Sequence, residues 1–200
     1  MMDNRIGGII LAGGMSRRFG SPKAFAKLDG IPFYEYIINA MKPVTDSIVI
    51  VTNDKLIERF QVNAPTIEII TDNPTISGYG PLAGIYSGMD YLAFDWYLIS
   101  PIDIPYIEVS VYQTLLQHIS YNTEAIIPIV NGRIQPLVSI FHRSIMDKIA
   151  AQLNRKELSL KQLLSKCKVD YIEMNNEKAF QNINYREDLQ IDSVKDITDS

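Results

Sequence analysis

Short apolar runs alternate with longer amphipathic segments along the first half of the chain, and the two patterns predict different secondary structures. Apolar runs predict buried β-strands at residues 6–11, 48–51, 67–70 and 96–100. Apolar residues at helical spacing predict helices around residues 34–41 and 83–91. This alternation is typical of an α/β, Rossmann-like fold with a mostly parallel sheet and helices on both faces. Because parallel crossovers are right-handed, the loops after the first, third and fourth strands should share one rim.

The second half of the chain has a different pattern. Apolar runs at residues 125–130 and 136–141 flank Asn131-Gly132, a dipeptide typical of a tight hairpin turn. The second run begins several residues after the turn, so a short loop or another neighbour in the sheet is the alternative. Further elements are predicted as helices at residues 145–153 and 159–165 and a strand at residues 169–172. Since no linker or repeat interrupts the chain, we expect one domain over residues 1–200.

The segment from Leu11 to Lys23 follows the first predicted strand and has the composition of a phosphate-binding loop. Glycines such as Gly13 and Gly14 let backbone N–H groups approach phosphate oxygens, and cations such as Arg17 and Lys23 neutralise their charge. The spacing fits neither the Walker A loop nor the dinucleotide-binding fingerprint. The alternative is a surface turn with scattered cations. A strand that ends in such a loop is where an open α/β sheet binds its ligand.

Charge and cysteine content narrow the range of partners and compartments. The 200 residues contain 19 Lys and Arg against 23 Asp and Glu, a net charge of −4, so we expect no nucleic-acid partner. The single cysteine, Cys167, cannot form an intramolecular disulfide, which favours a reducing compartment. No apolar run approaches the roughly 20 residues of a membrane span, and no signal peptide is evident. We therefore expect a cytoplasmic protein without a membrane partner.

Two aspartates follow predicted strands. Asp103 lies three positions after the end of the strand predicted at residues 96–100, between Pro101 and Pro105, where a carboxylate could bridge Mg²⁺ to phosphate oxygens. Asp72 ends the third strand. The alternative for each is an aspartate that accepts local N–H groups in a turn. Asn53, after the second strand, is a further candidate for contact with a base.

The segment from Gly80 to Gly84 begins the second predicted helix. N-terminal N–H groups of a helix can bind an anion or the polar edge of a base, although an ordinary helix start is the alternative. Near the C-terminus, alternation along an extended segment would put Asn182 and Asn184 on one face. Their amide groups could bind one polar ligand, and the alternative is an asparagine cap on a helix beginning near Tyr185.

These motifs together resemble the molybdenum cofactor guanylyltransferases, the molybdopterin-guanine dinucleotide biosynthesis protein A family. The resemblance lies in L-A-G-G-x-S-x-R-x-G-x-x-K at the start, G-P-L-A-G and D-I-P in the middle, and N-I-N near the end. It implies a nucleotidyltransferase architecture of the nucleotide-diphospho-sugar transferase type. It also implies that GMP is transferred from GTP to the phosphate of molybdopterin, with release of pyrophosphate. The chain departs from the family pattern after Asn184, where Tyr185-Arg186 replaces Thr-Pro.

The resemblance also implies roles for individual residues. Arg17, Lys23 and Asp103 would be catalytic, with Asp103 as the ligand of Mg²⁺, and Asn182 and Asn184 would bind the acceptor. Nucleotide-binding residues would be Leu11, Ala12, Gly13, Gly14, Lys23, Asp72, Gly80, Gly84 and Asp103. Residues 1–105 would form a nucleotide-binding half and residues 106–200 an acceptor-binding half.

Other functions fit the same motifs. One is a CTP-dependent molybdopterin cytidylyltransferase or another nucleotidyltransferase for small phosphates, although the adjacent Gly13 and Gly14 favour guanine. A second, from another class, is a nucleotide-binding or cofactor-carrier protein without turnover. Lys23 and Asp103 argue against the carrier, since a binding protein has less need of a metal carboxylate beside the phosphates. For the transferase, the partners would be GTP, molybdopterin with or without molybdenum, and proteins that deliver the cofactor.

Overall fold

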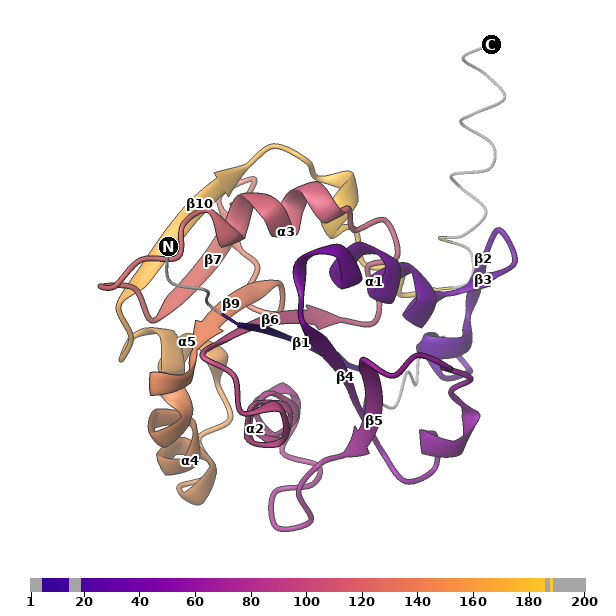
Figure 1. Ribbon diagram of the computed structural model, residues 1–200, viewed down its shortest axis with the longest axis horizontal. Coiled ribbons are helices and arrows are strands. Elements are labelled where there is room, and N and C mark those ends of the chain that lie inside the picture. The colour runs from indigo at the N-terminus through magenta and orange to yellow at the C-terminus, as the bar shows by residue number, and fades with distance from the viewer. Residues whose placement is uncertain (1–4, 15–18, 186–187, 189–200) are drawn as a thin grey trace.

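A mixed β-sheet runs through the centre of the computed structural model, which describes residues 5–14, 19–185 and 188 (Figure 1). In spatial order its strands are β10 (Val169–Met174), β7 (Ala125–Val130), β9 (Ser139–His142), β6 (Trp96–Pro101), β1 (Ile6–Leu11), β4 (Ser47–Thr52) and β5 (Ile67–Thr71), and β8 (Arg133–Ile134) pairs with β7. Strands β6, β1, β4 and β5 are parallel, as are β7 and β10. The mostly parallel sheet predicted from the sequence is confirmed.

Helices cover both faces of the sheet. The α-helices are α1 (Phe33–Met41), α2 (Pro81–Leu92), α3 (Val109–Leu116), α4 (Met146–Asn154) and α5 (Leu160–Leu164). Figure 1 shows α1 and α3 on one side of the sheet and α2 and α4 on the other. Because every central strand is buried on both faces, its sequence is apolar throughout rather than alternating.

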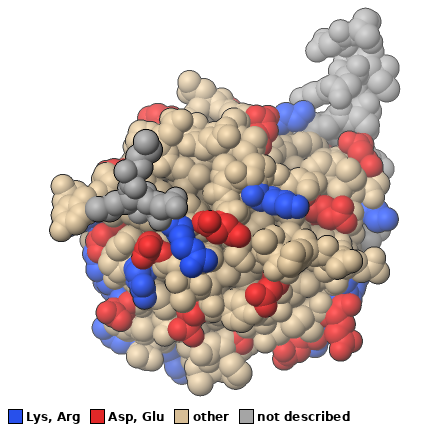
Figure 2. All heavy atoms as spheres, in the orientation of Figure 1, with Lys and Arg blue, Asp and Glu red and all other residues tan. Residues whose placement is uncertain are grey.

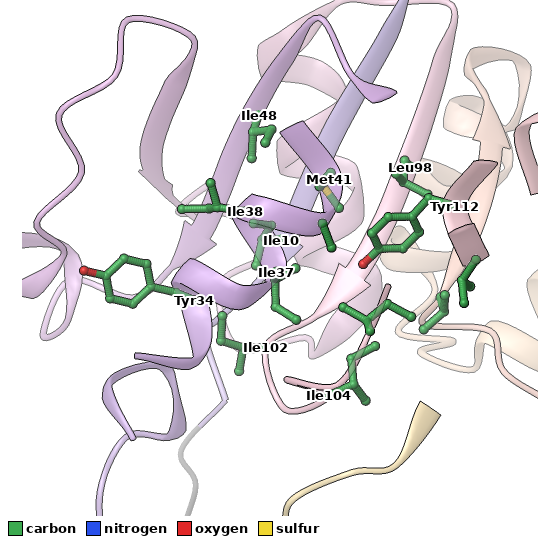
Figure 3. Close-up of a cluster of buried hydrophobic side chains, with 14 of the residues drawn as sticks. Ile10, Tyr34, Ile37, Ile38, Met41, Ile48, Leu98, Ile102, Ile104 and Tyr112 are labelled. Carbon is green, nitrogen blue, oxygen red and sulfur yellow. The ribbon is translucent and has the colours of Figure 1, made fainter. Parts of the chain in front are cut away.

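The two faces of β1 show how this burial works. Ile10 packs into one core cluster with Ile37 of α1 and Ile48 of β4, as Figure 3 shows, whereas Ile9 packs into the other cluster with Leu82 of α2. Ile9, Ile10 and Ile37 are all fully buried. The sheet is therefore fixed from both sides, which holds the ends of its strands in place.

The predicted strand over residues 136–141 is wrong at its start. Asn131 and Gly132 form the expected turn, with φ of 50° and 68°, but the turn leads into the short strand β8. The chain then turns at residues 135–138, and β9 begins only at Ser139. There β9 inserts between β6 and β7, antiparallel to both. This central position buries Ile140 and Phe141 on opposite faces of the sheet, which an edge hairpin would leave partly exposed.

Several short elements were not predicted from the sequence, among them β8. Helix α3 lies between β6 and β7, and a small two-stranded sheet joins β2 (Lys27–Leu28) to β3 (Ile31–Pro32). A short 3₁₀ turn, η1 (Lys23–Phe25), precedes β2. The remaining predicted strands and helices agree with the structure to within a few residues at each end.

Charges of both signs share the surface of the molecule. On the face drawn in Figure 2, Lys and Arg side chains lie among Asp and Glu side chains. Within the described part of the chain, no helix combines the length and the apolar composition needed to cross a bilayer.

Candidate active site

A cavity of about 670 Å³ opens beyond the carboxyl ends of β1, β4, β5 and β6. The predicted nucleotide-binding residues all line it: Leu11, Ala12, Gly13, Gly14, Lys23, Asp72, Gly80, Gly84 and Asp103. They come from four different segments of the chain, which the parallel sheet brings to one edge. The predicted rim is confirmed. Arg17, predicted to be catalytic, lies outside the described residues, as does Arg18.

The loop after β1 is attached to the end of β4. The backbone N–H of Ala12 donates to the carbonyl of Val51 at 2.8 Å, and the hydroxyl of Thr52 donates to the carbonyl of Ala12 at 3.3 Å. The side-chain amide of Asn53 donates to the carbonyl of Gly13 at 3.2 Å. Because these bonds hold one N–H and two carbonyl oxygens of the loop, they fix its course past the cavity.

Lys23 reaches the cavity from the 3₁₀ turn η1. Its ammonium group lies 3.0 Å from Oδ2 of Asp103 and 2.8 Å from Oδ1 of Asn184. Only 11% of its side-chain surface is exposed, against 26% for Asp103. Residues from the start, middle and end of the chain therefore meet at one cation.

Asp103 follows β6 at a point that several contacts fix. The hydroxyl of the fully buried Tyr112, on α3, donates to Oγ of Ser100 at 2.8 Å, and the N–H of Ile102 donates to the carbonyl of Leu11 at 3.2 Å. The carbonyl of Asp103 itself accepts from the N–H of Ile183 at 2.9 Å. The unpredicted helix α3 thus supports the segment that carries the candidate metal ligand.

Asp72 lies on the other side of the cavity, after β5. Burial raises the pKa of its carboxyl group above the ordinary value, and a hydrogen bond from the backbone of Gly78 acts in the opposite direction. A β-carbon built on Gly84 would lie 3.7 Å from Oδ1 of Asp72 and 2.8 Å from Cδ2 of Leu11. A side chain larger than that of glycine would therefore require the end of the Leu11 side chain to shift.

Helix α2 points its N-terminus into the cavity. Gly80 caps it with φ of 72° and ψ of −156°, a conformation that side chains with a β-carbon rarely adopt. Pro81 occupies the first turn, where its missing N–H is not needed by the helix. The remaining free N–H groups and the positive end of the helix dipole suit an anion or a polar base edge.

The donor set suits a hard divalent cation. Asp72 and Asp103 bring carboxylates to the cavity, and Lys23 hydrogen-bonds to only one oxygen of Asp103. The described residues contain no cluster of three or more His, Cys, Asp or Glu side chains that could hold a metal ion. Mg²⁺ needs only one or two carboxylates when substrate phosphates and water complete its coordination.

The predicted acceptor residues are placed differently from the nucleotide set. Ile183 is fully buried, and Asn182 and Asn184 are exposed on either side of it, as the alternation predicts. Neither asparagine lines the cavity itself. Asn184 joins the site through its hydrogen bond to Lys23.

Some cavity residues were not predicted from the sequence. Lys55, Ser77 and Leu137 line the cavity, and Leu137 does so from the turn before β9. Lys55 could have been found from its place just after a strand of the same rim. Leu137 could not, because its approach depends on the unexpected insertion of β9 into the sheet.

Solved structures share this architecture. Molybdopterin-guanine dinucleotide biosynthesis protein A from Archaeoglobus fulgidus is similar with a TM-score of 0.76 and 23% identity, covering 92% of this chain and 95% of that one. The 2-C-methyl-D-erythritol 4-phosphate cytidylyltransferase from Thermus thermophilus gives 0.69 and 15%, covering 94% and 96%. At these identities the likeness shows the fold alone.

Some relatives found by sequence have a higher identity to this chain than these solved structures do. A probable molybdenum cofactor guanylyltransferase of Bacillus cereus (strain Q1) is 41% identical over 197 residues, 96% of each chain. Another, of Bacillus anthracis (strain CDC 684 / NRRL 3495), is 39% identical over 201 residues, 98% of each chain. The family model described as the MobA-like NTP transferase domain matches residues 8–170. This chain belongs to that family of nucleotidyltransferases, together with the molybdenum cofactor guanylyltransferases.

Proposed function

We propose that this protein transfers GMP from GTP to the phosphate of molybdopterin and releases pyrophosphate. The observation that carries this proposal is the Lys23–Asp103 pair, with N···O of 3.0 Å, at a cavity lined by the glycine loop after β1. A cation and a metal-binding carboxylate at a nucleotide-sized cavity suit phosphoryl chemistry. Relatives named guanylyltransferases, at about 40% identity over nearly the whole chain, support guanine as the base and molybdopterin as the acceptor.

The reaction needs alignment and charge neutralisation more than acid–base chemistry. An oxygen of the acceptor phosphate attacks the α-phosphorus of GTP, a new P–O bond forms, and the bond from that phosphorus to the bridging oxygen breaks. The electron pair leaves with pyrophosphate. Because the attacking phosphate is already an anion, no strong general base is required. Lys23, with Arg17, would neutralise charge on the triphosphate, while the backbone around Gly13 and Gly80 would bind its oxygens.

The family uses a divalent metal, and we assign Mg²⁺ to Asp103 on the chemistry of its donors. Bound there, the ion would neutralise charge on the phosphate oxygens. Asp72 and Gly84 would bind the nucleoside from the opposite wall. Residues 1–105 would form the nucleotide half and residues 106–200, with Asn182, the acceptor half.

We also propose the compartment of the reaction and its protein partners. A chain with one cysteine is suited to the reducing cytoplasm, where the acceptor would be handed over by proteins that carry the cofactor. Such proteins would need access to the exposed segment around Asn182, which lies beside the cavity.

The direct test is an assay of the purified protein with Mg²⁺, molybdopterin and each of the four nucleoside triphosphates in turn. We expect pyrophosphate and the dinucleotide product from GTP alone. Product from CTP would show that the base is cytosine and not guanine, while the proposed transfer chemistry would stand. Binding of GTP without turnover would favour a carrier protein instead.

A further inference from the structure

The segment after η5 (Lys178–Phe180) returns the chain to the first loop of the fold. Ile183 is fully buried in a small cluster with Phe19 and Phe33, and its N–H donates to the carbonyl of Asp103 at 2.9 Å. These contacts join residues far apart in the sequence next to Asp103, which lines the cavity. The position of Asn184, the next residue, is set by these contacts.

The amide of Asn184 faces the ammonium group of Lys23. Oδ1 of Asn184 accepts from Nζ at 2.8 Å, and since an ammonium group only donates, the amide must present its oxygen there. The backbone of Asn184 is held in turn, because its N–H and that of Tyr185 both donate to Oδ2 of Asp188, at 2.8 and 2.9 Å. Asn184 is thus a fixed acceptor and not a freely rotating surface side chain.

We propose that Asn184 is a positioning residue for Lys23. Asp103 and Asn184 both accept hydrogen bonds from the ammonium group and hold it at the cavity, where the triphosphate would bind. A lysine side chain loses rotamer entropy when it is ordered. Holding it beforehand lowers the cost of nucleotide binding. The proposal rests on the proposed function in that the ligand of Lys23 is GTP, and it gives Asn184 a role on the nucleotide side as well as the acceptor side.

The first readout needs no nucleotide. Acylation of Lys23 by a small amine-reactive reagent, followed by peptide mass spectrometry, reports how well the ammonium group is held. Asn184→Ala should raise the labelling rate several-fold, and Asn184→Asp, which keeps an acceptor oxygen, should restore the low rate. Asn182→Ala is the matched control and should leave the labelling of Lys23 unchanged. Equal labelling in the wild type and Asn184→Ala would overturn the proposal whatever the protein's substrate is.

The second readout is GTP affinity in the presence of Mg²⁺ and the absence of acceptor. Loss of one hydrogen bond to a charged group should weaken binding on the order of 3-fold to 10-fold in Asn184→Ala. Asn184→Asp should not recover this loss in full, because its added negative charge lies beside the triphosphate, and Asn182→Ala should bind GTP as the wild type does. A higher KM for the acceptor with unchanged GTP affinity would show a purely acceptor-side role and contradict the proposal. If the wild type itself does not bind GTP, the proposed function fails, while the labelling result still decides whether Asn184 holds Lys23.

Discussion

The rings of Phe25 and Phe60 lie 4.7 Å apart between centroids, and this contact joins the turn that carries Lys23 to the segment after β4. Tyr34 of α1 packs edge-on against both rings, and the guanidinium of Arg59 lies 4.3 Å from the centroid of Phe25. Aromatic and cation–π contacts of this kind add stability beyond the area they bury. The position of Lys23 is therefore set by its second neighbour in the chain as well as by its own partners.

Replacing Phe25 tests this support without changing the cavity lining. Phe25→Leu should lower kcat/KM for GTP by about 10-fold, because a small displacement of a catalytic cation is costly. Phe94→Leu is the matched control, since Phe94 also packs under a guanidinium, that of Arg5, far from the cavity. Both variants should lose stability in urea unfolding, but only Phe25→Leu should lose activity beyond the loss of folded protein. Equal activity losses would mean that Phe25 acts through stability alone.

Asp103→Asn should separate binding from transfer. The variant keeps the shape of the side chain and the backbone bond to Ile183 but loses the charge that would hold Mg²⁺ and that pairs with Lys23. We expect transfer to fall by on the order of 10²–10³ or more, while GTP affinity changes only a few-fold. Steady-state kinetics and calorimetric GTP binding measure the two effects. Asp90→Asn, on the exposed side of α2, controls for the loss of one charge. Undiminished turnover in Asp103→Asn would exclude the metal role of Asp103.

Two glycines of α2 allow a matched comparison of packing and function. A β-carbon at Gly84 would lie 2.8 Å from Cδ2 of Leu11, and one at Gly88 would lie 2.8 Å from Cγ2 of Ile9. Overpacking costs about 1–3 kcal/mol, and the better helix propensity of alanine offsets up to about 1 kcal/mol of it. Gly84→Ala should also weaken GTP binding, because Leu11 lines the cavity and Ile9 does not.

Urea unfolding and GTP titration of Gly84→Ala and Gly88→Ala measure stability and affinity separately. Similar stability losses with a loss of affinity confined to Gly84→Ala would support the placement of the nucleotide against α2. If Gly88→Ala weakened GTP binding as much, the helix as a whole, and not the contact at Leu11, would control the site.

The parallel strands and the loops that meet at the cavity could be predicted from the sequence because local patterns determine them. Strands buried on both faces are apolar throughout, and the handedness of their connections brings the loops containing Gly13 and Asp103 to the same edge. Loop residues just after a strand, such as Asp72, could then be assigned to that edge without knowledge of the tertiary contacts.

The remaining contacts depend on pairings between distant segments. The insertion of β9 between β6 and β7, and with it the approach of Leu137, depends on which strands find each other, and no local pattern encodes that choice. The hydrogen bond between Lys23 and Asn184 spans 161 positions. The motif around Asn184 indicated a ligand-facing amide, but only the structure showed that the amide faces a lysine of the same chain.

Asp72 predicts a specific dependence of stability on pH. Burial raises the pKa of its carboxyl group above the ordinary value of 3.8. The folded chain therefore binds this proton more tightly than the unfolded chain does. As the pH rises from 3.8 through the raised pKa, the free energy of unfolding should fall, and it should stay lower at neutral pH. The carboxylate thus destabilises the fold where the protein functions, a cost that binding sites often carry.

Asp72→Asn removes this titration while keeping an oxygen that can accept the N–H of Gly78. The variant should be more stable than the wild type at pH 7, and the difference should shrink at pH 4.5, where the wild-type carboxyl group is closer to its neutral form. Urea unfolding at the two pH values measures the difference, and GTP titration at pH 7 should show weaker binding by the variant. A variant that is less stable at pH 7, or a difference that is the same at both pH values, would mean that the buried charge of Asp72 does not control stability. Greater stability together with lost affinity would show that this aspartate is kept for the ligand and not for the fold.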